Sequence, residues 1–183
     1  MTPERPTERD ILSTIVVLED GDEDFSVLRR ILADIRPDFI LDRVRDGDEL
    51  SARISRDPEG LLARLALFDV NVPGVSGIDC LAAWRRHDLL SAVPVVVLSG
   101  SARADEVDAC YRSGAAGYLA KPFGLSGYRR MLDALAGFWL DSTMPSPIIG
   151  TLTDDGSGDE QARAERSGGE GSPGAGETGG GGT

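Results

Sequence analysis

The stretch LALFDVNVPGVSG, residues 65–77, decides the fold of this chain. Its first part is a continuous apolar run that ends in an acid, Asp69, and its second part contains the proline and glycines of a loop that leads into a helix. A strand that is apolar on both sides is typical of a parallel sheet whose two faces are covered. We therefore expect a parallel sheet with helices on either side.

The same pattern recurs along the chain. Strand-like runs occupy residues 14–18, 39–44, 65–69, 93–98 and 117–120, and helical segments follow at 22–34, 47–56, 77–87, 104–113 and 125–140. Alternating elements of this length predict a doubly wound α/β fold, in which right-handed crossovers join parallel strands.

Five polar residues follow the ends of these strands. All strand ends of a parallel sheet lie at one edge, so we expect these side chains to converge. Two like charges there repel by about 4 kcal/mol at an effective dielectric constant near 20, so a cation has to lie between the acids. Mg²⁺ prefers oxygen ligands, and a lysine and a hydroxyl would stabilise a phosphoryl group carried by an aspartate. The residues are Glu19, Asp20, Asp69, Ser99 and Lys121.

From about residue 14 to residue 140, these motifs resemble the receiver domains of two-component response regulators. The resemblance implies a flavodoxin-like five-stranded sheet of order 2-1-3-4-5 with five helices. It also implies that Asp69 accepts a phosphoryl group from a histidine kinase. Asp20, Asp69 and the Asn71 backbone carbonyl would bind Mg²⁺, and Glu19 would act mainly through a metal-bound water.

The family resemblance also assigns a conformational switch. It implies that Ser99 and Tyr118 change position on phosphorylation, that Lys121 contacts the phosphoryl group, and that the bond before Pro122 is cis. Glutamate at Glu19 and serine at Ser99 are mild departures from the family pattern. A protein of this kind is not an enzyme, apart from its own phosphoryl transfer and autodephosphorylation.

Three other functions share features of this pattern. A phosphohydrolase of the haloacid dehalogenase type needs a second acid two residues after its nucleophile, where this chain has Asn71. A flavodoxin-like electron carrier binds a phosphate in its first loop, and the acids at residues 22–24 would repel it. A pseudo-receiver that is not phosphorylated and acts as a protein interaction module remains the alternative.

Composition limits the partners and the domain organisation. The net charge of -12 argues against nucleic-acid binding, and no apolar run reaches the roughly 20 residues that span a membrane, so we expect a cytoplasmic protein. Cys80 and Cys110 are expected to be buried, reduced thiols. We expect a flexible N-terminus (1–12), a receiver domain (13–140), a C-terminal arm (141–150) and a disordered acidic, glycine-rich tail (151–183).

The end of the last helix, Ala-Gly-Phe-Trp-Leu at residues 136–140, is followed closely by proline. It resembles the single-domain response regulators that partner bacterial and cyanobacterial phytochrome histidine kinases. This helix has a second apolar row beside its core-facing one, and the arm carries two isoleucines, which together predict a homodimer. The alternative is that the arm folds back on its own subunit. The predicted interface residues are Met131, Phe138, Trp139, Ile148 and Ile149.

Overall fold

The structure is a computed structural model that describes residues 6–141. Five parallel strands form one sheet in the order β2-β1-β3-β4-β5, which confirms the predicted topology. The strands are β1 (Thr14–Leu18), β2 (Ile40–Val44), β3 (Leu65–Asp69), β4 (Val95–Ser99) and β5 (Gly117–Ala120).

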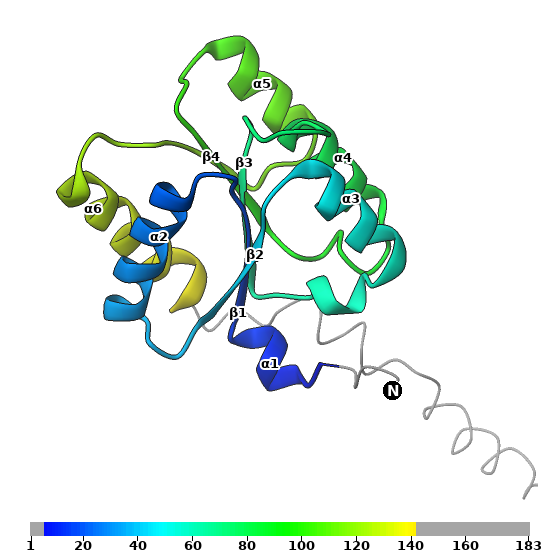
Figure 1. Cartoon of the computed structure of the whole chain (residues 1–183), viewed down its shortest axis with the longest axis horizontal. Helices are drawn as coiled ribbons and strands as arrows, with labels where there is room; N and C mark the ends of the chain where they lie inside the picture. The colour runs from blue at the N-terminus through cyan, green and yellow to red at the C-terminus, as the bar shows by residue number, and fades with distance from the viewer. Residues whose placement is uncertain (1–5, 142–183) are drawn as a thin grey trace, which may run out of the picture.

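Helices cover both faces of this sheet (Figure 1). On one face lie α2 (Asp22–Ile35) and α6 (Leu125–Leu135), and on the other lie α3 (Gly47–Arg56), α4 (Gly77–Arg86) and α5 (Ala104–Arg112). Side chains of a strand point alternately to the two faces, so the central strands contribute to two cores. Every residue of β3 and β4 is buried, as expected for strands covered on both sides.

Local signals explain where several helices begin and end. The side chain of Asp46 accepts a hydrogen bond from the Glu49 backbone N–H at 2.7 Å, so it caps the start of α3. After α5, Gly114 adopts a φ of 96°, which an L-residue rarely tolerates and which ends the helix.

Three elements differ from the prediction. A short helix, α1 (Glu8–Leu12), precedes β1 and begins with a capping box between Thr7 and Asp10. A 3₁₀ turn, η1 (Glu59–Leu61), precedes β3. The last helix is α-helical only to Leu135 and continues as a π-helix, η2 (Ala136–Leu140), which ends with a 3.0 Å bond from the Asp141 N–H to the Ala136 carbonyl.

Cys80 and Cys110 are buried and not joined by a disulfide, which confirms the prediction for both thiols. Within residues 6–141, none of the helices has the length and apolar character that a membrane crossing requires.

Candidate active site at the carboxyl edge of the sheet

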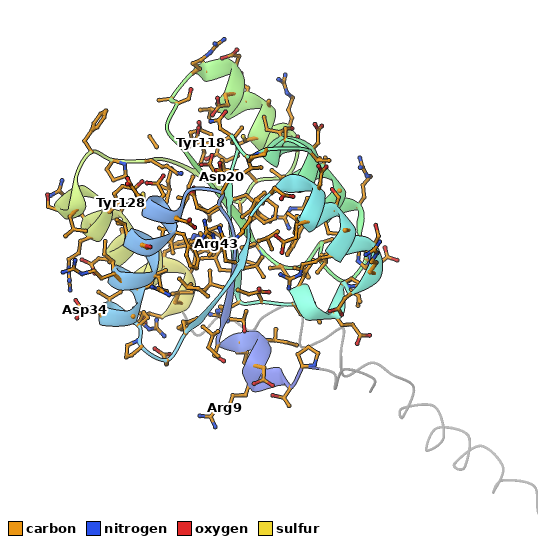
Figure 2. All side chains as sticks on the ribbon, viewed as in Figure 1. Arg9, Asp20, Asp34, Arg43, Tyr118 and Tyr128 are labelled. Atoms are coloured by element: carbon orange, nitrogen blue, oxygen red, sulfur yellow. The ribbon has the colours of Figure 1, made fainter. Side chains whose placement is uncertain are left out.

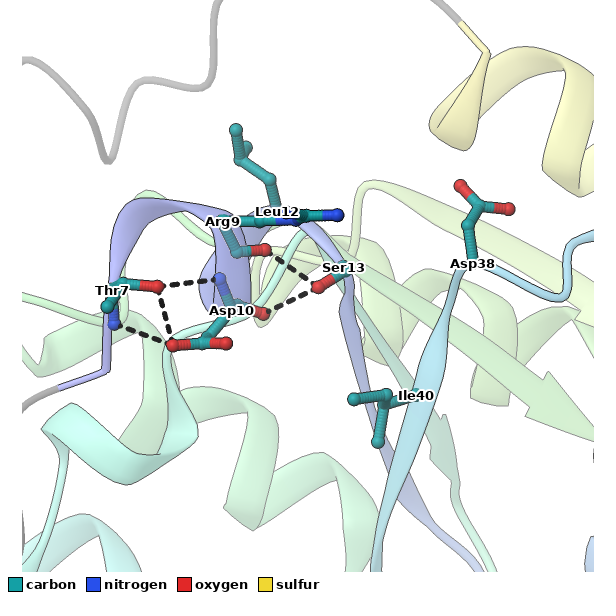
Figure 3. A pocket seen from close by; sticks show the side chains of 7 residues that line it. All are labelled: Thr7, Arg9, Asp10, Leu12, Ser13, Asp38 and Ile40. Carbon is teal, nitrogen blue, oxygen red and sulfur yellow. Dashed lines mark hydrogen bonds between the residues drawn. The ribbon is translucent and has the colours of Figure 1, made fainter.

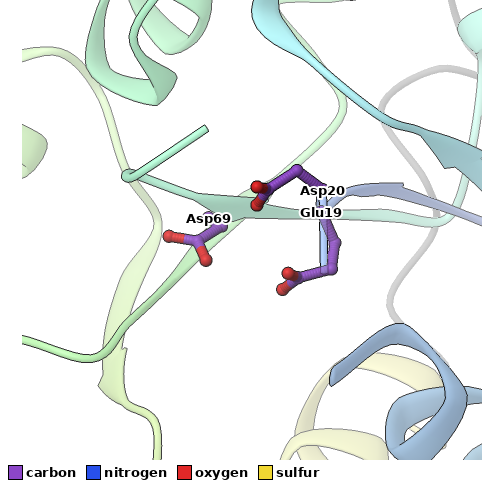
Figure 4. Close-up of side chains that lie close together, drawn as sticks. All are labelled: Glu19, Asp20 and Asp69. Carbon is purple, nitrogen blue, oxygen red and sulfur yellow. The ribbon is translucent and has the colours of Figure 1, made fainter. Parts of the chain in front are cut away.

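Three carboxylates meet where β1 and β3 end (Figure 4). One oxygen atom each from Glu19, Asp20 and Asp69 lies within 4.8 Å of the others. Glu19 and Asp69 are buried, whereas Asp20 is exposed. Burial raises the pKa of Glu19 above its ordinary value, although the nearby Lys121 ammonium opposes this shift. This all-oxygen set, open to water at Asp20, fits a hard divalent cation such as Mg²⁺.

Lys121 follows β5 and brings a positive charge to these acids. Its Nζ donates hydrogen bonds to Glu19 Oε2 at 2.7 Å, to Asp24 Oδ2 at 2.7 Å and to Asp69 Oδ2 at 2.6 Å. Burial disfavours the charged ammonium, but the bonds to Asp24, Asp69 and Glu19 outweigh it, so the pKa of Lys121 lies above its ordinary value. Asp24 was not among the predicted site residues.

The loop after β3 holds Asp69 through backbone contacts. The Asn71 backbone N–H donates to Asp69 Oδ1 at 2.8 Å. A Cβ atom at Gly77, the first residue of α4, would lie 2.2 Å from the Asp69 carbonyl oxygen, and one at Gly47 would lie 1.7 Å from the Val75 carbonyl oxygen. Only glycine fits at these two positions, which explains the glycine at the end of the stretch from residue 65 to 77.

The two predicted switch residues are linked by a residue that the sequence did not identify. Ser99 Oγ donates to Glu106 Oε1 at 2.6 Å, and the Tyr118 hydroxyl lies 2.6 Å from the same oxygen. The Tyr118 hydroxyl also lies 2.9 Å from the Ser101 carbonyl oxygen. Figure 2 labels Tyr118, which lies on β5, the strand paired with β4.

These contacts change the acidity of both groups. Burial raises the pKa of Glu106, but hydrogen bonds from Ser99 and Tyr118 outweigh it and leave the pKa below its ordinary value. Burial, followed by the bond to Glu106, raises the pKa of Tyr118 to about 12. Glu106 lies in the first turn of α5, where an acid is ordinary in any helix, so no local signal marks its contact with Ser99.

The expected cis bond before Pro122 is wrong for this structure. No peptide bond among the described residues is cis, so Lys121 is joined to Pro122 by a trans bond. The trans form of a bond before proline is favoured by about 0.5–1 kcal/mol. Lys121 reaches the acids with this trans bond in place.

The predicted dimer residues are only partly exposed. Phe138 has 67% of its surface exposed, whereas Met131 and Trp139 are half-buried and pack against the core. Ile148 and Ile149 lie outside the described residues.

A pocket of about 790 Å³ lies near α1 and the start of β2 (Figure 3). It is at the opposite edge of the sheet from the acids, because parallel strands begin there. It is lined by Thr7, Arg9, Asp10, Leu12, Ser13, Asp38 and Ile40. The pocket therefore takes no part in the candidate site.

Known response regulators are similar to this chain in sequence and in fold. Rcp1, a response regulator of Synechocystis sp., is 30% identical over 136 residues, which cover 72% of this chain and 92% of Rcp1. The structure of Mn(2+)-bound Rcp1 matches with a TM-score of 0.65 at 30% identity, covering 74% of this chain and 99% of that chain.

Two further solved structures are similar. One is the phosphorylated cyanobacterial phytochrome response regulator RcpA, with a TM-score of 0.67 and 30% identity over 73% of this chain and 99% of that chain. The other is RPA3017, a response regulator in red light signaling of R. palustris, with a TM-score of 0.61 and 26% identity over 72% of this chain and 97% of that chain.

A family model described as the response regulator receiver domain matches residues 15–133. This match covers the sheet except for Thr14, the first residue of β1, and it covers every residue of the acidic site, including Lys121. The chain therefore belongs to the receiver domain family of response regulators, whose members are not classical enzymes.

Proposed function

We propose that this chain accepts a phosphoryl group on Asp69 from the phosphohistidine of a histidine kinase and passes the signal on by a conformational or dimerisation change. The observation that carries the proposal is the meeting of three carboxylates within 4.8 Å, with the Lys121 ammonium 2.6 Å from Asp69 Oδ2. A carboxylate oxygen beside a buried positive charge is suited to attack phosphorus, because the charge stabilises the phosphoryl oxygens in the transition state.

In the proposed reaction, an Asp69 carboxylate oxygen forms a bond to phosphorus while the bond between phosphorus and the donor imidazole nitrogen breaks. The leaving imidazole takes up a proton. Asp20, Asp69 and the Asn71 carbonyl would hold Mg²⁺, with Glu19 acting through a bound water, and the cation would supply further positive charge to the phosphoryl oxygens. Lys121 and the Ser99 hydroxyl would hydrogen-bond those oxygens, and Tyr118 would move into the space that Ser99 vacates.

The experiment that tests this function is labelling with radioactive acetyl phosphate and Mg²⁺. The wild-type chain should take up label, and Asp69→Asn or excess EDTA should abolish it. Lys121→Ala should still be labelled but should lose the conformational response to phosphorylation. Stable labelling of Asp69→Asn, or full labelling of the wild type in EDTA, would contradict the proposal and favour the pseudo-receiver.

We further propose that the kinase is a phytochrome. Two similar proteins support this choice, as does the resemblance of residues 136–140, because RcpA is a phytochrome response regulator and RPA3017 acts in red light signaling. Phosphoryl transfer from a purified phytochrome kinase should be faster than transfer from a kinase of another class at equal concentration. Equal rates from both donors would remove the phytochrome link and leave the phosphoacceptor function intact.

The proposed readout surface is formed by α5, β5 and α6, and we propose that a homodimer forms through this surface and the segment after it, which begins with η2. Support comes from Phe138, an exposed aromatic residue whose ring packs against Trp139 with the centroids 4.9 Å apart. Burying one such side chain contributes roughly 1.5–3 kcal/mol, so a few of them offset the cost of association. We propose that the receiver domain spans residues 13–140, the C-terminal arm residues 141–150 and the acidic tail residues 151–183.

A further inference from the structure

Lys121 is held by three carboxylates, and one of them has no place in the proposed chemistry. That carboxylate is Asp24, in the first turn of α2. We infer that Asp24 is a positioning residue, which keeps the Lys121 ammonium in place while the metal and the phosphoryl group engage its other two partners. This inference rests on the proposed phosphorylation of Asp69.

The geometry around the ammonium uses all of its donors. The bond to Asp24 Oδ2 is 2.7 Å long, equal to the bond to Glu19 and close to the 2.6 Å bond to Asp69. An ammonium group has three hydrogens, so three carboxylates satisfy it completely. Asp24 is therefore an equal partner of Lys121 and not a distant charge.

The three carboxylates that bind Lys121 differ in their roles during metal binding and phosphorylation. The acids that lie close enough together to share a cation, among the described residues, are Glu19, Asp20 and Asp69. A cation bound there draws on the negative charge of Glu19 and Asp69, and phosphorylation converts an Asp69 oxygen into an ester. Asp24 lies outside this group, so neither the cation nor the phosphoryl group competes with Lys121 for it.

Asp24 is itself held from the other side of its carboxylate. Its Oδ1 lies 3.4 Å from the hydroxyl of Tyr128, a buried residue of α6, so the contact is a long hydrogen bond. The hydrogen bond that Lys121 donates to Asp24 also heads the interactions that raise the pKa of Lys121. The Asp24 side chain is 41% exposed, against 3% for Glu19, so solvent screening makes its effect moderate.

The ordinary explanation for Asp24 is that acids favour the first turn of a helix. Its neighbours in that turn fit this explanation, because Asp22 faces outward and pairs with Arg43 at 2.6 Å and Arg45 at 2.9 Å. Asp24 instead faces the buried ammonium of Lys121. Glu23 is an exposed acid of the same turn, so Glu23→Gln removes the same charge and serves as a matched control.

The test compares Asp24→Asn, Glu23→Gln and the wild type by their rate of labelling with acetyl phosphate at saturating Mg²⁺. Asp24→Asn should be slower by about three- to tenfold, as expected for the loss of a partly screened charge-assisted bond. Glu23→Gln should stay within about twofold of the wild type, since screened surface charges act weakly. Mg²⁺ affinity, measured by calorimetry, should be the same in the two variants, and Asp24→Glu should recover part of the rate.

A double-mutant cycle shows whether Asp24 acts through Lys121. In the Lys121→Ala background, Asp24→Asn should cause no further loss of rate, whereas damage to the fold would persist there. Equal rates for Asp24→Asn and Glu23→Gln, a faster Asp24→Asn, or an undiminished loss in the Lys121→Ala background would each overturn the inference alone. A wild-type chain that takes up no label would overturn the proposed function with it.

Discussion

Ser99 donates its hydroxyl proton to Glu106 at 2.6 Å, which ties the end of β4 to the first turn of α5. The Tyr118 hydroxyl lies 2.6 Å from the same carboxylate oxygen. One carboxylate thus connects both residues that are proposed to move on phosphorylation. Ser99 has to release Glu106 before its hydroxyl can bond a phosphoryl oxygen, so this contact stabilises the unphosphorylated arrangement.

Removal of the Glu106 carboxylate should make the switch easier to operate. A hydrogen bond contributes about 0.5–1.5 kcal/mol, so Glu106→Ala should bind beryllofluoride with Mg²⁺ about two- to tenfold more tightly than the wild type. The measurement is a titration followed by the amide NMR shifts of residues 99–121. Asp105→Ala is the control, because Asp105 is exposed and pairs with Arg103. Unchanged or weaker binding by Glu106→Ala would show that this contact does not oppose the switch.

The same contact predicts a dependence on pH. The pKa of Glu106 in the folded chain lies below its ordinary value of 4.5, so the ionised form contributes stability above that pH. This contribution is lost as the pH falls through the lower, folded-state pKa. Ser99→Ala should therefore raise the pKa of Glu106 toward 4.5, as measured by the carboxyl ¹³C shift during titration. A pKa of Glu106 that stays the same in Ser99→Ala would contradict the hydrogen bond as its cause.

Metal binding should appear as stability against heat. In Mg²⁺ at ten times its dissociation constant, the wild-type chain should gain about 1.4 kcal/mol of unfolding free energy. Asp20→Asn should lose most of this gain. In EDTA it should melt at or above the temperature of the wild type, because one of three mutually repelling carboxylates is gone. A full Mg²⁺ gain in Asp20→Asn would exclude Asp20 as a ligand.

The proposed dimer makes Phe138 the most informative surface position. Phe138 is 67% exposed, so Phe138→Asp should leave the melting temperature nearly unchanged while light scattering shows a shift from dimer to monomer. Ile40 is similarly exposed, at 63%, but lies on the edge strand β2, at the opposite edge of the sheet from β5, so Ile40→Asp should remain dimeric. A monomeric wild-type chain at tens of micromolar, with and without beryllofluoride, would rule out this interface.

Much of the fold was predictable because each strand has a local sequence pattern. An apolar run that stops at Asp69 or Ser99 specifies a buried strand and the residue at its end, and parallel topology then brings these ends together. The roles of Asp24 and Glu106 were not predictable, since both lie in first turns of helices, where acids are common for a different reason. Their contacts with Lys121 and Ser99 depend on how whole helices pack, and a short sequence motif does not predict that packing.

The helix ends also differ in whether the sequence predicts them, depending on whether a neighbouring residue or the packing of distant residues determines them. Asp46 and Gly114 mark the start of α3 and the end of α5 by residue type alone, because each acts within its own turn. The change from α6 to the π-helix after Leu135 was missed, since nothing in residues 136–140 forbids an ordinary helix. There the packing of Ala136 and Leu140 into the core accompanies the wider turn.

Gly77 leaves no clearance between α4 and β3 for even one methyl group, because its missing Cβ would lie 2.2 Å from the Asp69 carbonyl and 2.8 Å from the Val70 Cα. We therefore expect α4 and the end of the strand that carries Asp69 to keep their relative positions when the chain is phosphorylated. A displacement caused by phosphorylation would then pass through Ser99, Tyr118 and Lys121, which lie on β4, on β5 and directly after β5. Partners that sense the signal should accordingly read α5 and β5, while α4 offers them a surface that is the same in both states.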